Sequence, residues 1–119
     1  MSHILVCFLA YVLWTTLACA KTMNGHVIAV SAIDNEFKLL WDCETGVNYD
    51  HVACPLLLHR GIVYYGSPEG HIIAIDAESG QRLWGIKRGN SQVNRIVHDD
   101  LGRIWFTRID GSICCIETQ

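Results

Sequence analysis

The sequence predicts an all-β fold built from repeated four-stranded antiparallel units. Similar segments recur about every 43 residues along the chain. Each copy contains short runs of β-branched residues, such as HVIAVS and HIIAID, bounded by turns that contain glycine. No segment after the apolar N-terminus has the period of an amphipathic helix. With 119 residues in all, these observations indicate one small β domain.

The repeat is clearest in two segments that align without a gap. They are GIVYYGSPEGHIIAIDAE, which begins at Gly61, and GRIWFTRIDGSICCIETQ, which begins at Gly102. An earlier partial copy, LACAKTMNGHVIAVSA, places Gly25 at the position of Gly70. Repetition at this period is typical of architectures in which one structural unit is stacked many times.

Each repeat supplies up to four strands. We expect strands at 17–21, 26–31 and 37–43, then at 52–59, 62–66, 71–76 and 81–87, and finally at 93–99, 103–107 and 112–117. Four short antiparallel strands in about 43 residues make one blade of a β-propeller. The chain is therefore expected to hold two to three blades of an incomplete ring, and to be a segment of a longer propeller or one that closes by self-association. A solenoid of hairpins is the weaker alternative, because its repeat is usually shorter or helical.

One motif in the middle repeat resembles a known family. Ala74-x-Asp76-x-x-Ser79-Gly80-x-x-x-Trp84 resembles the tryptophan-docking motif of quinoprotein-type (PQQ-like) propeller repeats, with serine in place of the usual threonine. The resemblance covers one repeat fully and two in part. It implies that the motif is structural, with the acid and the hydroxyl holding a sheet corner, the glycine turning the chain and the tryptophan lying between blades.

The other two copies depart from this pattern. In the first, Trp41 takes the place of Trp84, Ala29 that of Ala74, and Ser31 replaces the acid. The third copy reaches Gln119 before its turn and tryptophan. A small residue recurs at one strand position (Ala29, Ala74 and Cys115), which suggests that a large side chain packs there.

Composition excludes several functional classes. The net charge of −3 is modest, and the nine Lys and Arg residues form no stripe, so no nucleic-acid partner is expected. The six cysteines match no zinc-binding spacing, and we expect them to be small apolar residues in strands, although four of them could pair as disulfides in an oxidising compartment. No metal site and no catalytic residue are predicted.

The N-terminus has two interpretations. Residues 4–20 are apolar, uncharged and end in Ala18-Cys19-Ala20, which is typical of a cleaved signal peptide. In this interpretation residues 1–20 are the signal peptide, residues 21–119 are the propeller repeats, and the protein is secreted or extracytoplasmic. In the second interpretation residues 17–20 belong to the first blade, which leaves the protein cytoplasmic. The apolar run is short for a membrane span.

Several polar residues are candidates for ligand or metal binding, but their positions in turns and strand ends favour a structural role. His26 and His71 follow equivalent turn glycines, and neighbouring blades are expected to present them side by side. Asp99-Asp100-Leu101-Gly102 is predicted to be a turn. We expect Lys21, Arg88 and Arg95 to be solvated. A redox disulfide between Cys114 and Cys115, which the quinoprotein resemblance suggests, would break the alternation of the strand ICCI.

Three functions remain open. The first is a non-catalytic propeller segment that serves as a scaffold or protein-interaction module, with a protein partner or the remaining blades of the propeller on its free surfaces and no cofactor. The second is a fragment of a quinone-dependent dehydrogenase, the one case in which PQQ would be the cofactor. The third is the accessory propeller of an adenylating enzyme of the beta-alanine-activating type.

Overall fold

The fold is a series of three antiparallel sheets, which we call blades. The computed structural model describes residues 10–14, 17–33, 36–47 and 56–117. The strands are β1 (Ala10–Trp14), β2 (Leu17–Lys21), β3 (His26–Ile33), β4 (Glu36–Glu44), β5 (Leu57–His59), β6 (Ile62–Gly66), β7 (His71–Asp76), β8 (Arg82–Lys87), β9 (Val93–His98), β10 (Arg103–Arg108) and β11 (Ile113–Glu117).

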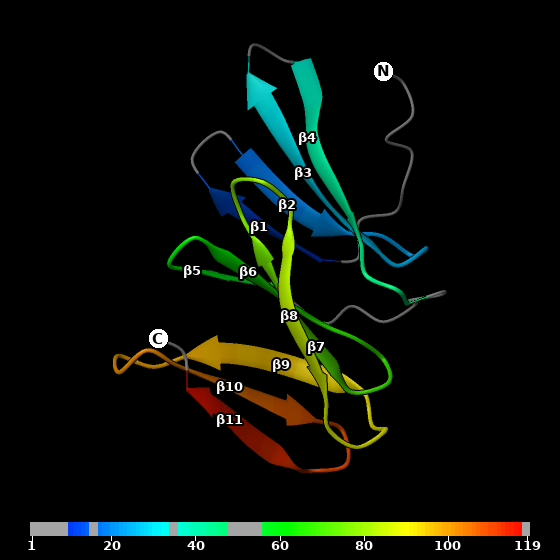
Figure 1. Ribbon diagram of the computed structural model, residues 1–119, viewed down its shortest axis with the longest axis vertical. Coiled ribbons are helices and arrows are strands. Elements are labelled where there is room, and N and C mark those ends of the chain that lie inside the picture. The colour runs from blue at the N-terminus through cyan, green and yellow to red at the C-terminus, as the bar shows by residue number, and fades with distance from the viewer. Residues whose placement is uncertain (1–9, 15–16, 34–35, 48–55, 118–119) are drawn as a thin grey trace.

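Each blade is a meander in which neighbours in sequence are neighbours in the sheet. The first blade has the order β1-β2-β3-β4, the second β5-β6-β7-β8, and the third contains β9, β10 and β11. The blades follow one another along the long axis of the molecule, with the third at the foot of Figure 1. The predicted all-β class and the antiparallel blades are confirmed, and the described residues form an open series and not a closed ring.

Turn residues set the boundaries of the strands. Gly25, Gly70 and Gly111 all have φ between 83° and 90°, a left-handed conformation that glycine adopts without strain. A two-residue turn joins β5 to β6, where Arg60 and Gly61 both have positive φ, as a hairpin of this length with the right twist requires. The turns therefore have the same glycine conformation in all three blades, as the alignment of the repeats predicts.

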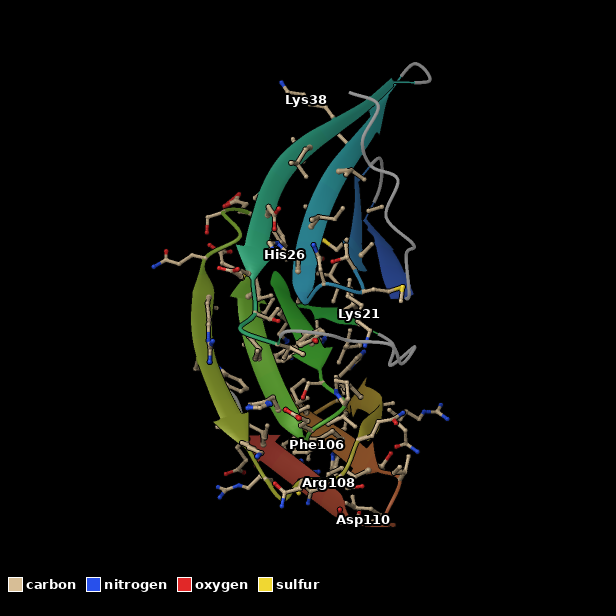
Figure 2. The ribbon with its side chains drawn as sticks, turned by 90° about the vertical axis from the view of Figure 1, so that its right-hand side faces the viewer. Lys21, His26, Lys38, Phe106, Arg108 and Asp110 are labelled. Carbon is tan, nitrogen blue, oxygen red and sulfur yellow. The ribbon has the colours of Figure 1, made fainter. Side chains whose placement is uncertain are left out.

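Two apolar clusters hold the blades together. The first lies between the first and second blades and the second between the second and third. The middle blade contributes opposite faces of the same strands, because Tyr65 joins the first cluster and Tyr64 the second. Phe106, labelled in Figure 2, belongs to the second cluster.

Lys21 corrects one expectation. Its side chain is fully buried and not solvated, and its ammonium donates to the carbonyl oxygen of Gly66 at 3.4 Å. The same ammonium lies 5.2 Å from the centre of the Tyr65 ring. Both partners belong to the second blade, so Lys21 links the first blade to the second (Figure 2). Sequence pattern did not reveal this because Lys21 ends a strand, where charged residues are usually exposed.

The segment interpreted as a signal peptide contains all of β1 and most of β2. β2 pairs with β3, with Cys19 opposite Ala29. Cys7 and Cys54 lie outside the described residues. No helix in the described part of the chain is long and apolar enough to cross a membrane.

Candidate functional site: the contacts between blades

The motif in the second blade forms a closed corner after β7. Ser79 Oγ donates to Asp76 Oδ2 at 2.9 Å, and the amide of Glu78 donates to Asp76 Oδ1 at 3.2 Å. The amide of Gly80 donates to the carbonyl oxygen of Asp76 at 2.8 Å. A short acidic side chain that accepts from backbone two residues ahead is the usual device for fixing such a turn.

Trp41 of the first blade docks onto this corner. Its Nε1 donates to the carbonyl oxygen of Ala77 at 2.9 Å, and the side chain is 8% exposed. The ring lies directly against Gly80, where an added Cβ would come within 2.5 Å of Trp41 Cδ2. Gly80 thus has two reasons to be glycine, its φ of +78° and the indole that covers it.

Ala74 is fully buried, and it lies between two aromatic residues. It pairs with Tyr64 on one side and with Trp84 on the other, and those two rings meet with their centres 6.1 Å apart at 55°. A methyl group at this position leaves room for the rings to approach over it. Ala29 occupies the same place in the first blade, between Cys19 and Trp41.

Trp84 is less buried than its equivalent. It packs against the second cluster but is only partly buried, whereas Trp41 is buried. In the third repeat the positions equivalent to Ala77 and Gly80 fall at or beyond residue 118, outside the described residues. The described part of the third blade therefore shows no corner on which Trp84 docks.

A β-bulge precedes each of the two tryptophans, Trp41 in β4 and Trp84 in β8. The pairing of β3 with β4 shifts after Ala29 opposite Trp41, which leaves Leu40 as the extra residue. The pairing of β7 with β8 shifts in the same way, and there Leu83 is extra. Both leucines are exposed, at 45% and 48%. The sequence signal is the Leu-Trp pair that precedes each turn, although bulges are rarely recognised from such a signal alone.

The remaining polar candidates are engaged within their own blades. His26 Nδ1 lies 2.6 Å from Asp42 Oδ1, and His71 Nδ1 lies 3.2 Å from Ser67 Oγ. Arg88 and Arg95 are exposed, as expected. In the part of the chain that the structure describes, no group of three or more His, Cys, Asp and Glu side chains is arranged to hold a metal ion.

Asp99 organises the turn between β9 and β10. It accepts hydrogen bonds from Trp105 Nε1 at 2.9 Å and from Arg103 Nε at 2.7 Å, and also from the amides of Leu101 and Arg103. These bonds, led by that from Trp105, stabilise the carboxylate and hold the pKa of Asp99 well below its usual range. The predicted turn is confirmed, and Trp105 and Arg103 are positioned on the outer face of the third blade.

A second contact between blades was not foreseen. The rings of His59, at the end of β5, and His98, at the end of β9, stack with their centres 4.0 Å apart. Burial, with smaller contributions from His98 and Arg60, lowers the pKa of His59. His59 Nε2 is buried and has no hydrogen-bond partner among the described residues.

The four described cysteines are free thiols on different faces. Cys19 and Cys43 are buried in the first cluster, and burial raises the pKa of Cys19 to about 11. Burial likewise raises the pKa of Cys43. Cys114 packs toward the second blade, whereas Cys115 is exposed on the opposite face of β11. The strand alternation therefore continues through both residues.

Comparison with solved structures gives the fold. The chain is similar to a europium-containing methanol dehydrogenase (17% identity, TM-score 0.70, 90% of this chain and 22% of that one). It is also similar to the RRP9 WD40 repeats (14%, 0.77, 93% and 35%) and to the quinohemoprotein alcohol dehydrogenase ADHIIG from Pseudomonas putida HK5 (17%, 0.72, 91% and 18%). Neither a protein-family model nor a curated protein matches the sequence.

These likenesses support a β-propeller-like fold and nothing finer. The chain spans about a fifth to a third of the length of the three proteins. Quinoprotein and WD40 structures resemble it to a similar degree, and one fold of this kind carries many activities. The described residues thus form an open series of propeller-like blades, and the contacts between blades are the best-defined sites in them.

Proposed function

We propose that this chain is a non-catalytic β-propeller segment that acts as a scaffold or protein-interaction module. One observation carries the proposal. The outer face of the third blade exposes positions whose equivalents in the second blade are buried against a neighbour. Cys115 is exposed where Ala74 is fully buried, and Trp105 is only partly buried where Tyr64 is buried.

The composition of this face suits an interface. Val97, Trp105 and Cys115 are paired in one row across β9, β10 and β11, and Ile113 is 65% exposed beside them. Arg103 lies with its guanidinium 5.6 Å from the Trp105 ring. Tryptophan and arginine held in place by hydrogen bonds are the residues that most often dominate binding energy.

Sedimentation velocity of the 119-residue chain over a range of concentrations tests this proposal. We expect self-association that Val97→Glu weakens, because the carboxylate would be buried in the apolar row. Leu101→Glu is the control, since Leu101 is 74% exposed in a turn. A monomer at every concentration, with no effect of Val97→Glu, would contradict an interaction role for this face.

The quinone-dependent alternative is tested in the same preparation. Titration with PQQ and Ca²⁺, followed by absorbance, would show saturable binding if the chain were a quinoprotein fragment. Dye-linked alcohol oxidation after reconstitution would then replace the scaffold proposal. If the gene that encodes this chain also encodes an adenylating domain, the chain would instead be the accessory propeller of an adenylating enzyme.

Export of the chain is proposed on the sequence alone. Cleavage after Ala20 would remove β1 and nearly all of β2, together with Cys19. The mass and N-terminal sequence of the mature chain decide this point. A chain that begins at Lys21 would support an extracytoplasmic protein, and an intact N-terminus would support the strand interpretation and a cytoplasmic one.

A further inference from the structure

The second and third blades are joined differently at the two ends of β9. At its start, the amide of Val93 donates to the carbonyl oxygen of Ser67 in the second blade at 3.1 Å. At its far end, His98 stacks on His59, the last residue of β5 in the second blade. Figure 1 shows this end of β9 on the same side of the molecule as the turn between β5 and β6. One end is therefore held by a backbone hydrogen bond and the other by two side chains.

The contact at the far end depends on the charge of its two rings. The imidazoles lie 4.0 Å apart with an angle of 16° between their planes. Neutral rings pack well in this arrangement, whereas two imidazolium rings would place like charges face to face. His59 Nε2 is buried and has no hydrogen-bond partner among the described residues, so a proton on it would have no acceptor there. His98 is exposed, which gives protons from the solvent access to the stack.

The groups around His59 offer little compensation for a positive charge. Burial, His98 and the neighbouring Arg60 all lower the pKa of His59. Asp99 is the one acidic group that acts on the ring and favours its charged form. That carboxylate is already paired with Arg103, whose Nε lies 2.7 Å from Asp99 Oδ2. Charging the ring therefore opposes the contact between the blades.

We propose that the stack of His59 on His98 is an acid-sensitive latch between the second and third blades. With both rings neutral, the latch holds the far end of β9 against the second blade. Protonated rings repel each other and this end separates, while the bond between Val93 and Ser67 acts as the hinge. β9 stays paired with β10, so the third blade moves as a unit. Separation brings solvent to Ile104, a buried residue of the second cluster that pairs with His98.

Acid favours the open state because that state binds more protons. In the closed state the pKa of His59 is lowered, so the open state takes up the proton at a higher pH. Opening begins below about pH 6.5, the pKa of a solvated histidine, and is complete below the pKa of the closed state. Histidine is the side chain whose ordinary pKa lies in this range.

Nuclear magnetic resonance of the 119-residue chain tests the latch without any substitution. Ring nitrogen shifts report the charge of His59 and His98, Overhauser effects between the two rings report the stack, and those between Val93 and Ser67 report the hinge. From about pH 7.5 down to the pH at which both rings are charged, we expect the ring-to-ring effects to fall at least about threefold while the hinge contact remains. Charged rings that keep their contact would overturn the proposal. Loss of the hinge contact together with the stack would also overturn it.

A double variant separates the charge of the rings from their contact. In His59→Phe/His98→Phe the rings can stack in the same place but cannot take up a proton, so their contact should be the same at both ends of the titration. His26→Gln is the matched control, because His26 contacts Asp42 within the first blade, and it should open as the unchanged chain does. Loss of the ring contact in acid by the double variant would show that the histidines do not control the junction.

Discussion

Trp41 secures the first blade to the second through one hydrogen bond and one ring contact. Its indole N–H reaches the carbonyl oxygen of Ala77, and its ring covers Gly80. Trp84 lies at the equivalent position and is only partly buried. Two tryptophans that the sequence treats alike thus differ in the free energy they contribute to folding.

We predict that Trp41→Ala lowers the free energy of unfolding by about 3–5 kcal/mol. Trp84→Ala should cost roughly half as much, because less of its ring is removed from water. Trp41→Phe separates the two contributions, since it keeps an aromatic ring and loses a hydrogen bond worth about 1 kcal/mol. Urea unfolding measures all three, and equal losses for both alanine variants would show that Trp41 is not the docked residue.

A matched pair of glycines tests the ring contact. Gly80 and Gly61 have φ of +78° and +77°, but an added Cβ meets Trp41 at Gly80 and nothing within 4 Å at Gly61. Gly61→Ala should therefore show only the left-handed strain of about 1–2 kcal/mol. Gly80→Ala should cost clearly more and should shift the fluorescence of Trp41. Similar losses at both positions would contradict the close packing.

The end of β5 in the second blade contacts the end of β9 in the third blade through two stacked imidazole rings. His59 closes β5 and His98 closes β9, and their stacking joins the second blade to the third. The groups that face His59 are His98, Arg60 and Asp99, and of these only Asp99 favours the charged ring. The contact is therefore built for a neutral His59.

Stability should fall as the pH drops through about 6.5, the pKa of histidine in an unfolded chain. The pKa of His59 is lowered in the folded protein, so the unfolded state binds the proton first and is favoured. The loss is complete once the pH lies below the folded pKa. We expect His59→Gln to reduce the pH dependence of the free energy of unfolding in this range, as measured by urea unfolding at several pH values. The control variant His71→Gln should keep the part of the pH dependence that comes from His59. An unchanged profile in His59→Gln would contradict the stacking.

The molecule as a whole is an open series of blades whose two junctions are unlike each other. The first holds Trp41, the buried Lys21 and two buried thiols. The second holds the partly buried Trp84 and the histidine stack. Two thiols on the third blade, one of them exposed, complete a set of four natural reporters.

Thiol labelling of the native chain should follow this order. Among the four described cysteines, Cys115 should react first with iodoacetamide, because it is exposed. Cys19 should be protected by burial and by its raised pKa, since the thiolate is the reacting form. Peptide mass mapping resolves each site, and labelling of Cys19 then reports separation of the first two blades. Early labelling of Cys19 in the native state would contradict the first cluster.

The strands from β3 onward and the corner made by Asp76, Ser79 and Gly80 could be predicted from the sequence, which left open whether residues 17–20 form a strand or belong to a signal peptide. These features depend on alternation and turn chemistry, which act over a few residues and are visible in the letters. Only the packing of the blades shows that Trp41 docks while Trp84 is partly buried, that Lys21 is buried, and that His59 stacks on His98. Such contacts join different blades, so they depend on how whole sheets pack and on which surface each sheet finds beside it.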